Sequence, residues 1–405
     1  MINGRFRKKP VAILLGMSAV AFSMGMLSLI LDSSIYGKGA NKILSGKGEV
    51  AFKNFNKVLA QINLGRDDEQ MAKKLKNEKI LDGLRASSRS SKDLHTIYFA
   101  GGCFWGTEAY FKKIPGVEET EVGYANGNSD NPSYEDVTRG SGHSETVKIV
   151  YDANVVSFYE LLLHYMRTID PTSVNRQGND IGIQYRTGIY FDKDDMDSYR
   201  QASVFLDNKS KELGQKLAVE LLPLDQFFKA EEYHQDYLDK NPNGYCHVNL
   251  SLADEPLFDA TPIKVSEEKL KDLSPDVYNI TQNKGTEAPF SHPYDHETRD
   301  GIYVDVVTGT VLFSSEDKYD SGCGWPAFSK SINNSLIDLE EDYSYGMSRI
   351  EVLSKDGNHL GHVFSDGPSE KGGLRYCING ASLRFIPKEE MKNEGYGEYL
   401  ALFKD

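Results

Sequence analysis

The sequence predicts a multi-domain protein with an N-terminal membrane anchor, a mixed α/β domain and an all-β domain. Three patterns support this prediction: an apolar run at residues 11–31, mixed strand and helix signals over 94–253, and short β-branched and aromatic runs with frequent turns over 265–405. A chain of 405 residues is long enough for two or three domains. Residues 37–93 are predicted to form a partly helical stalk, and residues 254–264 a linker.

The composition limits the classes of function. Hydrophobic residues make up 39% of the chain, which is sufficient for packed cores, and the formal net charge is −14. An acidic chain lacks the basic field that neutralises phosphates, so a nucleic-acid partner is excluded. Four cysteines are too few for a disulfide scaffold, although they permit two bridges in three possible connectivities. No Cys-x-x-Cys pair occurs, which argues against a zinc knuckle and a thioredoxin-type motif.

The first 36 residues are predicted to be a signal-anchor that crosses the cell membrane once. The apolar run Val11–Leu31 can span a hydrocarbon core of about 30 Å at about 1.5 Å per residue. Four cationic side chains precede it, and they should stay in the cytoplasm, so the rest of the chain would lie outside: Arg5, Arg7, Lys8 and Lys9. A signal peptide that is cleaved to release a secreted protein is the alternative, and a buried core helix is a weaker one.

Between the anchor and the first domain, two short amphipathic helices are predicted. One has apolar residues at helical spacing from Phe52 to Ile62, and the other runs around Met71–Leu84. Ser87–Ser91 resembles a flexible joint. This stalk is expected to act as a spacer or docking element without chemistry of its own.

Cys103 lies between a predicted strand, Ile97–Phe99, and a predicted helix, Phe104–Lys113. The positive end of a helix dipole lowers a thiol pKa and favours the nucleophilic thiolate, so Cys103 is a candidate nucleophile. Trp105 adds an aromatic wall beside the sulfur. The same local pattern also fits a buried structural cysteine.

A candidate acid begins the strand Glu145–Tyr151. Strand alternation puts Glu145 on the same face as Val147 and Ile149, which is the apolar face. Burial raises the pKa of a carboxyl group, so Glu145 would be protonated near neutrality and could act as a general acid. A frayed strand end, with Glu145 in solvent, is the alternative.

Further elements complete this domain, and Cys246 lies in its tail. We expect helices at 157–167, 198–216 and 231–238, and a strand at 184–191. Cys246 follows the turn Asn241–Gly244, where a mobile thiol would suit the role of a resolving partner. A plain surface thiol is the alternative.

The all-β domain is predicted from five short strands: Ile302–Val307, Thr310–Phe313, Ile350–Leu353, Leu374–Ile378 and Ser382–Ile386. Alternation places Arg375, Cys377 and Asn379 on one face, an electropositive setting that stabilises a thiolate. His359 and His362 precede this strand, and no further cysteine or carboxylate cluster completes a metal site with them. Cys323 lies between two glycines and is followed by Trp325, again a cysteine beside an aromatic residue.

Together these motifs resemble the methionine sulfoxide reductases, with an A-type domain fused to a B-type domain. The A-type matches are Gly102–Gly106, Gly142–Glu145, Arg176–Arg186, Ala230–Gln235 and Asn243–His247. The B-type matches are Lys318–Pro326, His359–Phe364 and Arg375–Asn379. The resemblance covers residues 95–250 and 265–402 and implies an α/β fold followed by a β fold.

The resemblance implies a role for each A-type residue. Cys103 would attack the sulfoxide sulfur and become a sulfenic acid, Glu145 would donate a proton, and Cys246 would form the disulfide. The substrate oxygen would be held by Tyr134, Asp180 and Tyr185, and the methyl group by Phe104 and Trp105. The A-type domain would reduce the S epimer.

The B-type half would reduce the R epimer with a second set of residues. Cys377 would be the nucleophile and Cys323 the resolving thiol, with His359 and His362 transferring protons. The site would be shaped by Trp325, Arg375 and Asn379.

The resemblance also implies the partners. Oxidised proteins or free methionine sulfoxide would be substrates, a thioredoxin-like donor would reduce both disulfides, and the role would be protein repair under oxidative stress. Many B-type members hold zinc with two Cys-x-x-Cys pairs, but these positions are Asp305, Thr308, Leu353 and Asp356 here. We therefore expect no zinc and no other cofactor.

Two other functions are compatible with four cysteines. A general thiol-disulfide oxidoreductase is one, but it would be expected to carry Cys-x-x-Cys. An anchored adhesin with structural disulfide bridges is the other, and its thiols should not respond to methionine sulfoxide.

Overall fold

The computed structural model describes residues 72–88, 90–258 and 261–403. The predicted anchor, residues 1–36, and the predicted helix from Phe52 to Ile62 lie outside these ranges. Within the described ranges, no helix is both long enough and apolar enough to cross a membrane.

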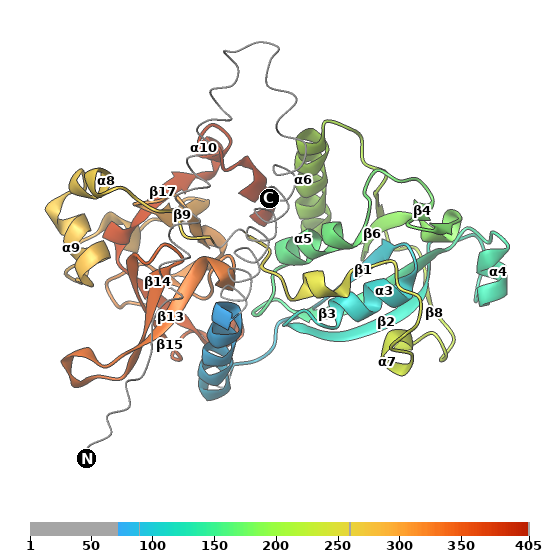
Figure 1. The fold of residues 1–405 in the computed structure, drawn as a ribbon, viewed down its shortest axis with the longest axis horizontal. Helices are drawn as coiled ribbons and strands as arrows, with labels where there is room; N and C mark the ends of the chain where they lie inside the picture. Colours follow the sequence, from blue (N-terminus) through green and yellow to red (C-terminus); the bar gives the residue numbers. More distant parts are fainter. Residues whose placement is uncertain (1–71, 89, 259–260, 404–405) are drawn as a thin grey trace, which may run out of the picture. The chain divides into compact units, whose positions relative to one another are not determined.

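Residues 90–258, the α/β region, contain a six-stranded sheet in the order β7-β6-β1-β3-β2-β8. Neighbouring strands are antiparallel, except that β6 and β7 are parallel. The strands are β1 (Leu94–Gly101), β2 (Val117–Ala125), β3 (Ser144–Asp152), β6 (Thr187–Phe191), β7 (Glu220–Pro223) and β8 (Phe227–Lys229). Three helices pack against this sheet (Figure 1): α3 (Phe104–Phe111), α5 (Phe158–Thr168) and α6 (Met196–Leu213). The predicted mixed α/β fold is confirmed.

Shorter elements complete the α/β region. They are α4 (Tyr134–Thr138), β4 (Arg176–Gln177), β5 (Asp180–Ile181), the 3-10 turns η2 (Ile183–Tyr185) and η3 (Leu250–Ala253), and α7 (Tyr237–Lys240). The turn η2 replaces the first residues of the strand predicted at 184–191, and β6 forms the rest.

The helix predicted at 231–238 is wrong. Residues 232–236 form turns, and only α7 follows, because Asp236 adopts a positive φ of 52°. The side chains of this segment bond to distant backbone instead of to a helix: Gln235 accepts from the Val122 N–H at 3.0 Å, and Glu231 from the Tyr134 N–H at 2.9 Å. Tertiary hydrogen bonds therefore outweigh the helical pattern here.

Residues 261–403, the β region, contain two antiparallel sheets in the orders β10-β9-β17 and β11-β12-β16-β15-β14-β13. The first consists of β9 (Gly301–Asp305), β10 (Val311–Ser314) and β17 (Leu383–Pro387). The second consists of β11 (Lys318–Tyr319), β12 (Ala327–Phe328), β13 (Ile337–Asp342), β14 (Arg349–Ser354), β15 (His359–Phe364) and β16 (Arg375–Ile378). The predicted β fold is confirmed, with each predicted strand within two residues of an observed one.

Short helices complete the β region. They are α8 (Glu267–Lys271), α9 (Pro275–Asn283) and α10 (Lys388–Met391), with 3-10 turns η4 (Pro293–Asp295), η5 (Ser315–Asp317), η6 (Asn334–Leu336), η7 (Ser344–Gly346), η8 (Ser369–Lys371), η9 (Gly380–Ser382) and η10 (Gly397–Leu402).

A helix at residues 72–88 confirms the prediction around Met71–Leu84 and covers an edge of the larger β sheet. Asn77 donates to the Ile337 carbonyl at 2.7 Å and accepts from the Leu339 N–H at 3.1 Å, so it pairs with the open edge of β13. Leu81 is fully buried in the core of the β region. This part of the predicted stalk therefore belongs to the packed structure.

Replacing Leu81 should destabilise the protein because its side chain fills part of that core. We expect Leu81→Ala to lower the free energy of unfolding by about 2–5 kcal/mol. Leu75→Ala, on the same helix but with a half-exposed side chain, is the matched control and should have a much smaller effect. Equal effects of the two changes in chemical unfolding would contradict the docking of this helix.

Candidate active sites

Cys103 occupies the N-cap position of α3, directly after β1, as the sequence predicts. Its side chain is 7% exposed. Gly102 makes the turn with a φ of 86°, and a Cβ there would lie 2.6 Å from Gln177 Cβ, so the backbone approach requires glycine. The turn aims the sulfur at the end of the sheet where β3 begins.

Glu145 lies beside Cys103 and is 2% exposed, so the alternative of a solvent-exposed strand end is wrong. Its Oε2 accepts a hydrogen bond from the Phe104 N–H at 3.2 Å. Burial raises the pKa of Glu145 to about 8. The predicted protonated carboxyl group near neutrality is therefore confirmed.

The expectation of a lowered pKa at Cys103 is wrong for the free protein. Burial raises the pKa of the Cys103 thiol well above its usual range, and the neighbouring Glu145 carboxylate raises it further. The hydrogen bond from the Trp105 backbone acts in the opposite direction but is the smaller effect. Burial of the sulfur away from water therefore raises the pKa of Cys103 more than the dipole of the two-turn helix α3 lowers it.

Three polar side chains predicted to hold the substrate oxygen gather at the same place. The hydroxyl groups of Tyr134 and Tyr185 are hydrogen-bonded, and burial followed by the charge of Glu145 raises the pKa of each tyrosine. Asp180 acts electrostatically on Cys103 and Glu145 and accepts from the Tyr245 hydroxyl at 3.1 Å. Both phenols stay protonated at neutral pH and can donate hydrogen bonds.

The two aromatic residues after Cys103 differ in exposure. Phe104 is 1% exposed, whereas Trp105 is half-buried and stacks on Tyr237 with ring centroids 3.7 Å apart. Trp105 Nε1 donates to His234 Nδ1 at 3.1 Å, and the His234 ring also contacts Phe104 and Tyr134. His234 was given no role from the sequence, although it lies in the motif Ala230–Gln235 that carries the resemblance.

Cys246 is brought next to α3 by the chain that follows α7. A Cβ on Gly106 would lie 3.0 Å from Cys246 Sγ, so this glycine lets the tail pack against the helix. Cys246 Sγ donates to the Val248 carbonyl at 3.1 Å, and its charge influences Cys103. All four cysteines are free thiols. Cys246 therefore lies near Cys103 without being bonded to it.

At the second site, Cys323 and Cys377 are in direct contact, with their sulfur atoms 3.4 Å apart. The shared hydrogen bond lowers the pKa of Cys323 to about 5 and raises the pKa of Cys377 well above its usual range. Ser321 Oγ also donates to Cys323 Sγ at 2.9 Å. The two thiols therefore titrate as a pair that readily loses its first proton and holds its second.

This pairing corrects the expectation that the electropositive setting of Arg375 stabilises a thiolate at Cys377. Arg375 does lower the pKa of both thiols, but at Cys377 the bond to Cys323 and burial outweigh it. The guanidinium also forms two bonds of 2.8 Å with Asp366 and lies over the Phe364 ring. The predicted shared face is confirmed: Arg375 and Cys377 are half-buried, while Tyr376 between them is buried.

His359 and His362 lie on the same side of β15, although residues three apart normally face opposite sides of a strand. The pairing of β14 with β15 passes from Val352–Gly361 to Leu353–His359, so one extra residue bulges out. The two rings are consequently 5.6 Å apart. His362 is the cross-strand neighbour of Cys377, which places one imidazole beside the sulfur.

Each histidine is held by a carboxylate. His359 Nδ1 lies 2.7 Å from Glu351, and its Nε2 has no partner among the residues that the structure describes. His362 Nε2 lies 2.8 Å from Asp342, and burial lowers the pKa of His362. Both imidazoles are fixed in orientation.

A cavity of about 120 Å³ lies in front of Cys377. It is lined by Thr286, Trp325, Arg349, Gly361, His362, Phe364, Cys377 and Asn379. Glu287 supports two of these residues: its carbonyl accepts from Trp325 Nε1 at 3.2 Å, and its N–H donates to Asn379 Oδ1 at 3.1 Å. Glu287 and Arg349 carry no sequence signal that marks them, because both act through tertiary contacts.

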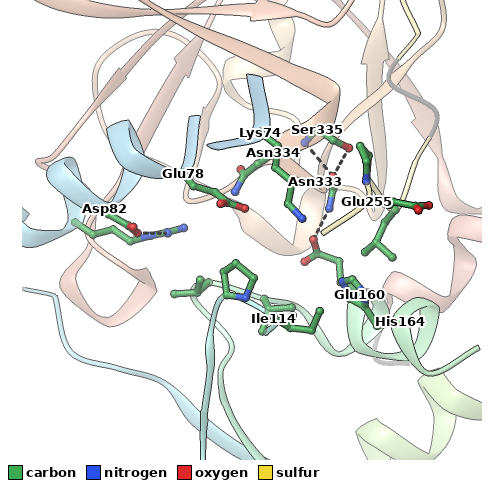
Figure 2. A pocket seen from close by; sticks show the side chains of 16 residues that line it. Lys74, Glu78, Asp82, Ile114, Glu160, His164, Glu255, Asn333, Asn334 and Ser335 are labelled. Atoms are coloured by element: carbon green, nitrogen blue, oxygen red, sulfur yellow. Dashed lines mark hydrogen bonds and ion pairs between the residues drawn. The ribbon is translucent and has the colours of Figure 1, made fainter. Parts of the chain in front are cut away.

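A further pocket, of about 140 Å³, contains none of the predicted residues (Figure 2). Its polar groups serve packing: the half-buried Glu160 carboxylate caps α5 through Ser157 and accepts from Asn333 Nδ2 at 2.6 Å. We assign it no chemistry.

The four positions at which B-type relatives hold zinc do not fit that metal here. The Asp305 carboxylate accepts from Asn358 Nδ2 at 2.9 Å and from the Val307 N–H at 2.7 Å, and Asp356 accepts from Thr310 at 3.0 Å. Leu353 has no donor atom. Across residues 72–88, 90–258 and 261–403, no group of three or more His, Cys, Asp or Glu could hold a metal ion. The carboxylates of Asp305 and Asp356 are therefore engaged in hydrogen bonds within the protein.

Comparison with known proteins finds a family match for each half of the chain. The family model for peptide methionine sulfoxide reductase matches residues 95–263, and that for the SelR domain matches residues 273–387. Methionine sulfoxide reductase A of Corynebacterium diphtheriae is 38% identical, with 39% of this chain and 80% of that chain covered and a TM-score of 0.37.

Two structures of Mxr1 from Saccharomyces cerevisiae are also similar. The reduced form is 36% identical, with 39% of this chain and 92% of that one covered and a TM-score of 0.36. Mxr1 in complex with Trx2 is 25% identical, with coverage of 36% and 84% and a TM-score of 0.26.

The pKa of Glu145 predicts a pH dependence of stability. Because its folded-state pKa of about 8 is above the ordinary value of 4.5, the folded protein holds a proton that the unfolded chain releases. The free energy of unfolding should therefore fall as pH rises from 4.5 to 8. Glu145→Gln removes this contribution, so we expect the variant to match wild type at low pH and to unfold at a higher temperature at pH 8.

The exposed Glu232→Gln is the control for loss of a carboxyl group. A Glu145→Gln variant whose stability changes equally at all pH values would contradict the raised pKa.

Proposed function

Because the chain belongs to the methionine sulfoxide reductases and joins an A-type to a B-type domain, we propose that it repairs both epimers of methionine sulfoxide through separate cysteine centres. The observation that carries the proposal is that each centre places two thiols and a side chain able to transfer protons together: Glu145 at the first and His362 at the second. The A-type site would take the S epimer and the B-type site the R epimer.

At the A-type site, the Cys103 sulfur attacks the sulfoxide sulfur while Glu145 gives its proton to the oxygen. Oxygen passes to Cys103, methionine leaves and a sulfenic acid remains, so the substrate is reduced and the cysteine oxidised. The Tyr134 and Tyr185 hydroxyls support this step because protonated phenols can donate to the developing negative oxygen. The half-buried Trp105 ring offers an apolar wall for the substrate methyl group.

The high pKa of Cys103 in the free protein is compatible with this route. Glu145 is neutral at pH 7, which removes the repulsion that its carboxylate would exert on a thiolate. The Cys103 proton can therefore be lost once substrate binds and the polarised sulfoxide lies against the sulfur. Cys246 then attacks the sulfenic acid, a disulfide forms and water leaves.

At the B-type site, Cys377 attacks and Cys323 resolves. Their contact at 3.4 Å supports rapid disulfide formation, because only a small movement brings the sulfur atoms to bonding distance. His362 lines the cavity and is held by Asp342, which suits proton transfer to the substrate oxygen. We assign His359 a supporting proton-transfer role, and Trp325, Arg375 and Asn379 the shaping of the pocket.

Each cycle leaves a disulfide that needs two electrons. We propose a thioredoxin-like dithiol as the donor, in line with the solved complex of the A-type enzyme Mxr1 with Trx2. Free methionine sulfoxide and oxidised proteins are the proposed substrates. We propose that no zinc takes part, because Leu353 offers no side-chain ligand and hydrogen bonds occupy the carboxylates of Asp305 and Asp356.

The assignment of one epimer to each centre is tested by cysteine variants of the full chain. Cys103→Ser should abolish reduction of the S epimer and leave the R epimer unaffected, and Cys377→Ser should do the reverse, by epimer-resolved chromatography. Cys246→Ser is the informative control, because it should release one methionine per protein and then stop without a disulfide. Loss of both epimers from a single change would refute independent centres.

We also propose that residues 1–36 anchor the protein in the cell membrane with both catalytic domains outside the cytoplasm; secretion after cleavage is the alternative. The cationic side chains before the apolar run Val11–Leu31 support this orientation.

The anchor is tested by fractionation of cells that express the full chain. We expect the protein to stay in the membrane pellet after carbonate at high pH and to be released by detergent. A variant lacking residues 1–36 should be soluble in the same assay. Release of the intact chain by carbonate alone would exclude a spanning segment.

A further inference from the structure

One buried carboxyl group near the A-type site has no part in the proposed chemistry. Glu108 lies in α3, three residues after Trp105, and is 1% exposed. Its Oε2 accepts a hydrogen bond from the Asp236 N–H at 3.0 Å, and its Oε1 accepts from the Thr120 hydroxyl at 3.4 Å. Burial raises the pKa of Glu108 to about 7. Because a carboxyl group is costly to bury, its presence here calls for a reason other than stability.

The bond from Asp236 to Glu108 holds a turn of unusual backbone conformation. Asp236 has a φ of 52°, in the left-handed region that residues other than glycine seldom occupy. It precedes α7, which lies beside α3 (Figure 1). The Asp236 carboxylate also pairs with Lys112 of α3, but these two side chains are 46% and 32% exposed, and exposed ion pairs contribute little. The shielded bond to Glu108 is therefore the firmer attachment of the turn.

Residues on both sides of this turn hold the Trp105 indole. His234 precedes the turn, and its Nδ1 accepts from Trp105 Nε1 at 3.1 Å. Burial lowers the pKa of His234, so the imidazole is neutral at pH 7 and its Nδ1 can accept. Tyr237 follows the turn, and its ring stacks on the indole with centroids 3.7 Å apart. The course of the backbone at Asp236 therefore sets both contacts of the indole.

We propose that Glu108 is a positioning residue of the A-type site, which fixes Trp105 through the turn at Asp236. The inference rests on the proposed function, in which the indole is the wall for the substrate methyl group. That methyl group meets the same wall before and during oxygen transfer. A loosened wall should therefore weaken substrate binding more than it slows the chemical step.

The kinetic test uses the full chain, reduced beforehand and freed of reductant, in single turnover with methionine (S)-sulfoxide. Glu108→Leu keeps the size of the side chain but has no acceptor. It should raise the half-saturating sulfoxide concentration about fivefold, the effect of one lost buried hydrogen bond, with the maximal rate within about twofold. Glu108→Gln keeps an oxygen that can accept from the Asp236 N–H, so both values should stay within about twofold of wild type.

The control variant is Glu119→Leu, which makes the same change at an exposed position of β2. It should leave the half-saturating concentration unchanged. Reduction of methionine (R)-sulfoxide at the B-type site of each preparation should also be unchanged, because Glu108 acts on the A-type site alone.

A spectroscopic measurement follows the indole directly. Trp105 and Trp325 are the two tryptophans of the chain, so Trp105 alone emits in a Trp325→Phe background. There, Glu108→Leu should shift the emission to longer wavelength, because an indole released from His234 and Tyr237 gains contact with water. Glu108→Gln should leave the emission unchanged.

Wild-type half-saturation or unchanged emission in Glu108→Leu would overturn the positioning role. Equal impairment in Glu108→Gln would also overturn it, because the hydrogen-bond acceptor would then not be what matters. If the unmodified chain reduces no methionine (S)-sulfoxide, the proposed function is wrong, whereas the emission still decides whether Glu108 holds Trp105.

Discussion

The close approach of distant chain segments to each reactive cysteine is the constraint on which both sites depend. A sulfenic acid is useful only if a second thiol reaches it before further oxidation. At Cys103, the tail with Cys246 packs against α3 because Gly106 has no side chain. At Cys377, a Cβ on Gly361 would lie 2.1 Å from the Cys377 carbonyl oxygen, so only glycine lets β15 and its histidines come so near.

The two sites differ in the protonation of their reactive groups before substrate binds. Around Cys103, exclusion of water raises the pKa of both the thiol and Glu145. Without substrate the site is therefore neutral, and the Glu145 carboxyl group keeps its proton. Around Cys377, thiol–thiol contact and Arg375 favour loss of one proton, and that proton leaves from Cys323. At the first site the thiol therefore loses its proton only when substrate binds. At the second site the pair of thiols has already lost one proton before substrate binds.

Positioning of the B-type site extends beyond its immediate residues. Asp342 connects His362 to the strand hairpin, and Glu287 ties Trp325 to Asn379. The helix at 72–88 covers the outer edge of β13, the strand that carries Asp342. A segment that precedes both catalytic domains in sequence thus contributes to the rigidity of the sheet behind the second site.

The sequence by itself determined the two fold classes and marked the four cysteines, because strand alternation and glycine-flanked cysteines are local patterns that survive without knowledge of the fold. It offered Glu145 as an acid that was either buried or exposed, and the structure decided for burial. The sequence also placed Arg375 and Cys377 on one face. Only the tertiary structure decided the thiol acidities, since water exclusion at Cys103 and the bond between Cys323 and Cys377 arise between segments far apart in sequence. The same holds for the β-bulge that unites His359 with His362, the lost helix at 231–238, and the places of His234, Glu287 and Arg349. Each depends on long-range packing or hydrogen bonding, for which a linear pattern carries no signal.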